Sequence, residues 1–124
     1  MARIFGVGLR HQNFKEFKEF AFTEEDRPDF LEIHSENYFA KNDFERDFLA
    51  QLASNYQLSF HRVGLSLGSV DQLDLKHLKQ IKELCDEFKP LLVSEHLSWS
   101  SFANQHFHDL LPLPLIDDSL ILLS

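Results

Sequence analysis

Residues 58–96 read LSFHRVGLSLGSVDQLDLKHLKQIKELCDEFKPLLVSEH, and this stretch decides the fold class. It opens with a short apolar strand at 58–61, followed by a loop and a helix whose apolar side chains recur at helical spacing. Asp74 is placed to cap that helix, and Pro90 ends it before a second apolar strand at 91–96. A strand, a helix and a strand in this order predict a βαβ unit with parallel strands.

The same alternation continues towards the N-terminus. In chain order, the expected strands cover residues 4–9, 30–34, 58–61 and 91–96. Residues 13–22 have the apolar spacing of a helix. A second helix, with Asn42 or Asp43 as its cap, should direct Phe44 towards the core. The helix that follows Asp74 should likewise direct Leu75 towards the core. Right-handed crossovers would place these helices on one side of the sheet. We therefore expect an α/β fold of about four parallel βα units.

The end of the chain is expected to be irregular from Ser98 onward. Residues 106–114 contain two prolines, which are incompatible with a helix interior, and are predicted to form a loop. Residues 116–123 begin like a helix and finish on an apolar run that nothing later in the sequence covers. The sequence thus predicts that residues 1–124 form a partial domain, cut short relative to a complete fold.

Composition narrows the class of protein. The 124 residues carry a formal net charge of −8, which disfavours binding to nucleic acid or to an anionic membrane surface. No apolar run approaches the roughly 20 residues that span a bilayer. The single cysteine, Cys85, cannot form an internal disulfide and suits a reducing compartment. We expect a cytoplasmic globular protein.

Three histidines stand at the ends of successive expected strands: His34, His61 and His96. The carboxyl ends of parallel strands share one crevice, so all three rings should project towards a common mouth. Imidazole is the usual protein ligand for iron, zinc or copper, and carboxylates complete such sites. The spacing therefore favours a metal site at this mouth.

Acidic and amide side chains accompany these histidines. Glu36 and Asn37 follow His34, while Glu95 precedes His96. Alternation along a strand should send Glu95 and His96 to opposite faces. A single histidine at a strand end is more often just a hydrogen-bonded polar residue, so the site hypothesis depends on the shared register of all three.

Other features favour structural roles. The segment 64–69 lacks the lysine and the glycine spacing of a phosphate-binding loop, and its glycines are better explained by close backbone approach. His77 falls on the polar face of its helix and is expected to be solvated. Cys85 faces inward and is expected to be a core residue.

Five ordered blocks of this sequence resemble the motifs of one bacterial family. The blocks are Gly6-Val7-Gly8-Leu9-Arg10, Leu31-Glu32-Ile33-His34-Ser35-Glu36-Asn37-Tyr38, His61-Arg62-Val63-Gly64-Leu65-Ser66-Leu67-Gly68-Ser69, Val93-Ser94-Glu95-His96-Leu97-Ser98-Trp99-Ser100 and His108-Asp109-Leu110-Leu111-Pro112-Leu113-Pro114. This is the domain-of-unknown-function 692 family of multinuclear non-haem iron-dependent oxidases, which includes the oxidase subunit of methanobactin biosynthesis.

The resemblance implies a xylose-isomerase-like TIM barrel with iron ions, two or three of them, at its C-terminal mouth. Family members use dioxygen to remodel cysteine in ribosomally made precursor peptides, often with a partner protein that presents the peptide. Carried over to this sequence, the histidine ligands fall on His61 and His96, with His34 as a less secure third. In the same comparison Glu36 and Asn37 line the site, while Glu95 is a ligand or supports one. These last three are our candidate catalytic residues.

Three hypotheses follow from the length of the chain, because a TIM barrel typically needs about 250 residues and eight βα units. The first is the N-terminal half of such an iron oxidase, inactive by itself. The second is a different divalent-metal enzyme on the same barrel, an isomerase or a hydrolase. The third is a non-catalytic remnant or a half-barrel that forms a homodimer. Metal identity and dependence on dioxygen would separate the first two.

Overall fold

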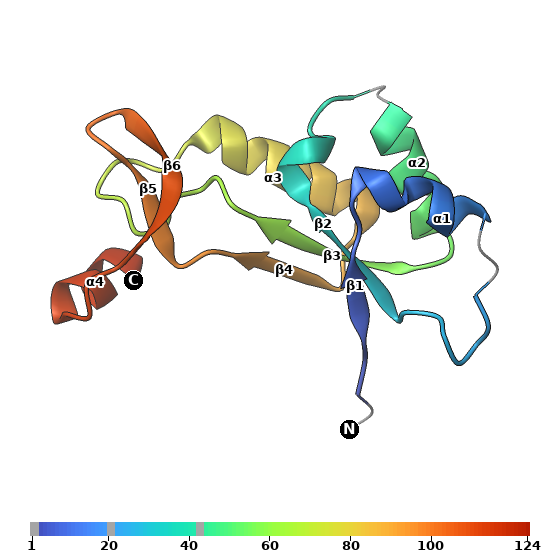
Figure 1. Cartoon of the computed structure of the whole chain (residues 1–124). Helices are drawn as coiled ribbons and strands as arrows, with labels where there is room; N and C mark the ends of the chain where they lie inside the picture. Colours follow the sequence, from blue (N-terminus) through green and yellow to red (C-terminus); the bar gives the residue numbers. More distant parts are fainter. Residues whose placement is uncertain (1–2, 20–21, 42–43) are drawn as a thin grey trace.

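The computed structural model describes residues 3–19, 22–41 and 44–124 and contains a parallel sheet, a hairpin and several helices (Figure 1). The sheet consists of β1 (Gly6–Gly8), β2 (Phe30–His34), β3 (Gln57–Arg62) and β4 (Leu92–Glu95). Its strand order is β1-β2-β3-β4, and every neighbouring pair is parallel. The expected α/β fold with a four-stranded sheet of βα units is confirmed, and this arrangement is consistent with half of a TIM barrel.

The helices between the strands lie on one side of the sheet (Figure 1), as right-handed crossovers require. They are the 3₁₀ helix η1 (His11–Asn13), α1 (Phe14–Glu19), the 3₁₀ helix η2 (Ser35–Tyr38), α2 (Phe44–Ala53) and α3 (Leu75–Phe88). Asp74 caps α3 as predicted, since its carboxylate accepts hydrogen bonds from the amides of Lys76 and His77. The predicted caps of α2, Asn42 and Asp43, lie outside the described residues, as do residues 20–21 of the expected first helix.

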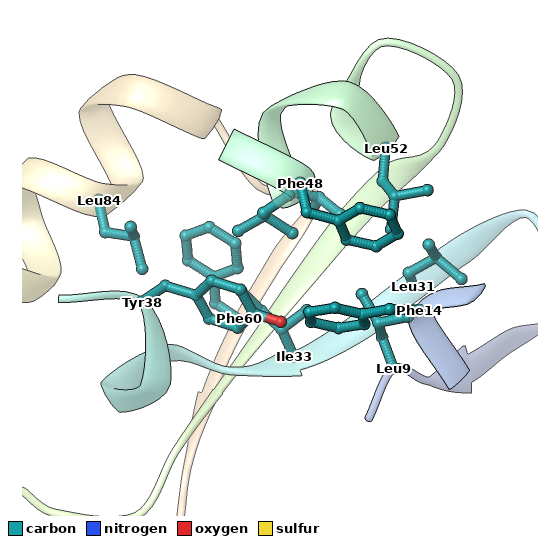
Figure 2. Packing of buried hydrophobic residues seen from close by; sticks show 11 residues of the cluster. Leu9, Phe14, Leu31, Ile33, Tyr38, Phe48, Leu52, Phe60 and Leu84 are labelled. Carbon is teal, nitrogen blue, oxygen red and sulfur yellow. The ribbon is translucent and has the colours of Figure 1, made fainter. Parts of the chain in front are cut away.

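The core lies between the sheet and these helices (Figure 2). Leu31 and Ile33 of β2 and Phe60 of β3 have no exposed surface, and they pack against Phe48 of α2 and Leu84 of α3. The alternation along β2 and β3 sends these apolar residues to the helix side. The intervening residues, among them the histidines, therefore face the opposite side, which would be the interior of a closed barrel.

Three expectations about burial were wrong. Phe44 and Leu75 were expected to face inward but are 69% and 77% exposed. Each is the first residue of its helix, where the apolar stripe extends beyond the part of the helix that covers the core. The strand β1 was expected to be buried, but all its residues are exposed, because β1 is an edge strand.

The irregular tail was also a wrong prediction. β5 (Ser98–Phe102) and β6 (Gln105–Pro112) form an antiparallel hairpin, so much of the expected loop at 106–114 is a strand. The two-residue turn, Ala103 and Asn104, has positive φ values of 50° and 61°, which define a turn that sequences usually announce with Asn-Gly. Asp71 completes it, because its carboxylate accepts hydrogen bonds from both turn amides. The expected helix at 116–123 is confirmed as α4 (Asp117–Leu123).

The hairpin is fastened to the loop that follows β3. The hydroxyl oxygen of Ser66 accepts hydrogen bonds from the amides of Ser100 and Ser101 at 2.8 and 3.2 Å. The amide of Gly68 donates to the carbonyl of Ser98 at 2.8 Å, and a Cβ at Gly68 would lie 3.0 Å from that carbonyl oxygen. Gly68 therefore approaches the hairpin backbone closely, as expected, whereas the nearest neighbour of Gly64 is the ring of His77. The hairpin is held at the carboxyl end of the sheet, beside the histidines.

Candidate functional site

The strands β2, β3 and β4 bring His34, His61 and His96 together at one end of the sheet. In the parallel register His34 is paired with His61, and His61 with Ser94, so that His96 follows immediately at the end of β4. The ring centroids of His34 and His61 are 5.6 Å apart, and those of His61 and His96 are 4.6 Å apart. The structure thus groups the three rings at the ends of neighbouring strands, as the strand-end spacing predicted.

The closest pair in this group is His61 and His96. Their Nε2 atoms face each other at 2.9 Å, so two ring nitrogens lie side by side. The other nitrogen of His61, Nδ1, lies 2.8 Å from the hydroxyl oxygen of Ser94. That hydrogen bond fixes the orientation of the ring, as the second nitrogen of a metal-binding histidine usually requires. Sequence reasoning gave Ser94 no role, although the register opposite His61 is the signal that identifies it.

The donor set fits a metal ion in part. Two nitrogens bound to one metal at about 2.1 Å and at right angles lie about 3.0 Å apart, and His61 and His96 present their Nε2 atoms at 2.9 Å. A non-haem iron site generally also needs a carboxylate. Within residues 3–19, 22–41 and 44–124, no three His, Cys, Asp or Glu side chains gather closely enough to hold an ion. The chain therefore offers two adjacent ligands but an incomplete set.

Glu95 lies next to this pair but is turned away from it by the strand. The register places Glu95 beside Arg62, on the sheet face opposite to Ser94. Its Oε1 accepts a hydrogen bond from the amide of His96 at 2.9 Å, which fixes the backbone that carries the histidine. Its Oε2 is buried and has no hydrogen-bond partner in the described structure. A buried carboxylate oxygen without a donor is costly, so this atom is available to a further group.

Glu36 is held at the site by the backbone that follows β3. Its Oε1 accepts hydrogen bonds from the amides of Val63 and Gly64, at 3.0 and 3.1 Å. His77 of α3 lies 3.4 Å away, with its side chain only 17% exposed, so the expectation that His77 is solvated was wrong. The first turn of α3 folds back over the loop after β3, which brings a residue from the nominally polar helix face against Glu36.

Asn37 lies on the other side of the mouth. It is exposed, and together with His34 and Arg10 it lines a surface depression of about 530 Å³. The structure thus brings Asn37 to His34 but reports no contact between Asn37 and the His61–His96 pair. Its lining combines these polar side chains with apolar ones such as Leu9 and Phe14.

Two further ionisable groups are unsuited to nucleophilic chemistry. Partial burial raises the pKa of the Cys85 thiol above its usual value, which favours the protonated thiol; Cys85 packs against the core but is only partly buried, so it is less enclosed than expected. Burial, together with the negative charge of Glu45, raises the pKa of Tyr38 to about 12.

Sequence comparison identifies the family. The family described as RiPP precursor modification enzyme MbnB/TglH/ChrH matches residues 4–124, which include all three histidines. The chain belongs to this family. The match confirms the resemblance deduced from the five sequence blocks.

The lengths of curated relatives show what fraction of a family member's sequence this chain covers. A UPF0276 protein of Vibrio vulnificus (strain YJ016) is 48% identical over 117 residues, covering 93% of this chain but 38% of the relative. A UPF0276 protein of Psychromonas ingrahamii is 45% identical and is covered to 37%; one of Rhizorhabdus wittichii is 36% identical and is covered to 41%. The chain thus spans about two fifths of the length of these relatives. In the described part of the chain, no helix combines the length and apolarity needed to cross a membrane.

Proposed function

We propose that this chain forms part of a non-haem iron-dependent oxidase that modifies cysteine in ribosomally made precursor peptides. The observation that carries this proposal is the pair of Nε2 atoms of His61 and His96, 2.9 Å apart at the mouth of the sheet. Family membership supports a precursor peptide as the substrate, and the histidine pair supports a metal site at this position.

Each candidate residue has a distinct role in this proposal. His61 and His96 bind iron through Nε2, and His34, whose ring centroid lies 5.6 Å from that of His61, is the third candidate ligand. Glu95 orients His96 through the bond to its amide, and Glu36 anchors the chain that follows β3. Iron, when bound, supplies the redox chemistry by which dioxygen oxidises the peptide.

The peptide is proposed to approach through the depression that His34, Asn37 and Arg10 line. Asn37 offers both a donor and an acceptor, which is the combination that an extended peptide backbone needs. A partner protein that presents the peptide would bind outside this mouth. The reducing cytoplasm is the proposed location, since it keeps the cysteine of the peptide in its thiol form.

The chain alone is proposed to be inactive as an oxidase. Two adjacent imidazoles form only part of the usual set of two histidines and a carboxylate. Among the described residues no carboxylate joins the pair, and His34 does not lie close enough to complete a three-ligand group. Catalysis therefore requires further ligands from the rest of a barrel, in keeping with a chain that spans 38% of its Vibrio vulnificus relative.

Metal binding tests the ligand assignment directly. The purified chain is titrated with Co²⁺, a spectroscopic substitute for Fe²⁺, and the visible absorption of the bound ion is recorded. We expect His61→Ala and His96→Ala each to weaken binding by at least about tenfold, the range seen even for residues that only support ligands. His108→Ala, an exposed histidine in β6, is the matched control and should bind like the wild type. Unchanged binding in both ligand variants would show that the assignment is wrong.

Metal identity tests the reaction class. Protein purified without chelators from cells supplied with iron should contain iron above zinc and manganese. Zinc or manganese in its place, at the same two histidines, would instead support the alternative of a divalent-metal isomerase or hydrolase.

A further inference from the structure

The parallel sheet has two free edges, and both expose apolar side chains. On β1 and the residues before it, Ile4 and Phe5 are 53% and 69% exposed. On β4, Leu92 and Val93 are 53% and 44% exposed. β1 and β4 are the outer strands in the order β1-β2-β3-β4, and within the part of the chain that the structure describes no strand pairs with the outer side of either. Unpaired apolar edges of this kind are a liability that closure of a barrel removes.

The register of the sheet defines how such a closure would align the two edges. Following the printed pairs across the sheet, Val7 aligns with Leu31, Leu31 with Leu58, and Leu58 with Leu91. An eight-stranded barrel of this type returns to its first strand displaced by about eight residues, and each half contributes about four. If the β1 strand of a second copy lay beside β4, its Val7 would therefore lie about four residues before or after Leu91.

Only one direction of that displacement is possible. A shift towards the N-terminus would place the incoming β1 beside residue 87, which belongs to α3. The opposite shift places residues 4–8 beside residues 92–96, so that β1 and the two residues before it lie along β4 and His96. Phe5 then lies beside Val93 on the helix side, and Ile4 beside Leu92 on the interior side. Two exposed apolar pairs thus match in position and in face, while Val7 falls beside Glu95.

We propose that a second copy of this chain occupies both edges and completes an eight-stranded barrel. Two copies related by a twofold axis along the barrel supply eight parallel strands, and each contributes the same two edges. Both sets of His34, His61 and His96 then face one mouth, so the partner copy contributes residues to the site. This completed mouth rests on the proposed function, whereas the dimer itself needs no metal.

The oligomeric state tests the interface. We expect the metal-free chain, of 14.5 kDa, to sediment and scatter light at twice that mass. Phe5→Lys and Val93→Lys should each shift the protein to the mass of one chain, because each buries a charge at both junctions. Phe44→Lys is the matched control, since Phe44 is also 69% exposed but lies on α2, away from both edges. Circular dichroism verifies that each variant is folded.

Mixing two variants makes the test independent of folding defects. Phe5→Lys alone and Val93→Glu alone should be monomeric. An equimolar mixture should recover the dimer, because one junction then pairs lysine with glutamate and the other keeps Phe5 beside Val93. A monomeric wild type, or a mixture that stays monomeric, would overturn the proposal.

Cross-linking provides the register. With Cys85→Ser as background, Phe5→Cys and Val93→Cys in one chain should form a disulfide between copies. Within one chain these positions lie on strands three intervals apart, about 14 Å, which no disulfide spans. The barrel would be refuted if the chain dimerised without forming this cross-link and the dimer dissociated in Ile121→Lys, a change on the exposed face of α4. That result would assign the contact between copies to α4. Because none of these measurements involves metal, their failure leaves the iron proposal to its own test.

Discussion

His77 Nε2 lies 3.4 Å from Glu36 Oε1, and this contact links α3 to the 3₁₀ helix that follows β2. The same carboxylate oxygen accepts the amides of Val63 and Gly64, so the chain leaving β3 is held between two other elements. Because His61 lies only two residues before Val63, this arrangement limits how far the His61 backbone can move.

Gly64 is the position at which this contact can be tested by adding a methyl group. A Cβ at Gly64 would lie 2.7 Å from Cε1 of His77, closer than such atoms approach in proteins. We expect Gly64→Ala to lower the free energy of unfolding by about 1–3 kcal/mol, the usual cost of overpacking. In a His77→Ala background the cost should shrink, because the obstructing ring is gone. Urea unfolding of the four proteins measures both values.

Gly8→Ala serves as the control for backbone effects, because a Cβ at Gly8 would meet nothing within 4 Å. If Gly64→Ala cost the same with and without the His77 ring, the close approach described here would not be what makes glycine necessary.

The sheet was predictable because each strand is an apolar run of limited length between clear breaking signals. Leu31 and Ile33 alternate with polar residues, and Pro90 separates α3 from the next strand, so strand number and order followed from pattern alone. The grouping of the histidines was predictable for a related reason. Strand ends in a parallel sheet lie together, so His61 and His96 had to meet once the order was known.

What the sequence did not reveal depends on contacts between distant segments. His77 has the position of a solvated residue in a helical pattern, and only the fold of the loop over β3 brings it to Glu36. The hairpin was missed because Ala103 and Asn104 are not a typical turn pair, and their turn is completed by Asp71, more than 30 residues earlier. Local propensity contains neither relationship.

Arg46 is predicted to stabilise the segment that carries Glu36 and Asn37. Its side chain is 10% exposed; Nη1 donates to the carbonyl of Tyr38 at 3.0 Å, and Nη2 contacts Glu87 at 2.5 Å. We expect Arg46→Ala to lower the free energy of unfolding by about 1–3 kcal/mol, because a buried carbonyl loses its donor.

Glu87→Gln provides the comparison in urea unfolding. Since Glu87 is 48% exposed, solvent weakens its attraction to the guanidinium, and the cost should stay below about 1 kcal/mol. Equal losses for the two variants would mean that the ion pair, and not the bond to Tyr38, provides the stability.

Asp74 gives a prediction about acid stability. Hydrogen bonds from the amides of His77 and Lys76 lower the pKa of its carboxyl below the ordinary value of 3.8, the bond from His77 having the larger effect. Because the folded-state pKa is the lower one, ionised Asp74 stabilises the fold fully above pH 3.8. That contribution is lost as the pH falls through the lowered pKa.

Asp74→Asn keeps a capping oxygen but removes the titration. The difference in melting temperature between wild type and Asp74→Asn should therefore be constant near neutral pH and should move in favour of the variant as the pH falls below 3.8. Parallel melting curves over the whole acid range would contradict this assignment.

The turn of the β5–β6 hairpin offers a stabilising change. Ala103 and Asn104 both have positive φ, which costs a residue with a Cβ about 1–2 kcal/mol unless its side chain suits that conformation. The double change Ala103→Asn with Asn104→Gly places the pair preferred by this turn at the same two positions. We expect slower hydrogen exchange at the paired amides of β5 and β6, because the hairpin opens less often. Asp71→Ala should have the opposite effect, since its carboxylate accepts hydrogen bonds from both turn amides. Faster exchange in the Asn-Gly variant would show that the turn conformation differs from the one described here.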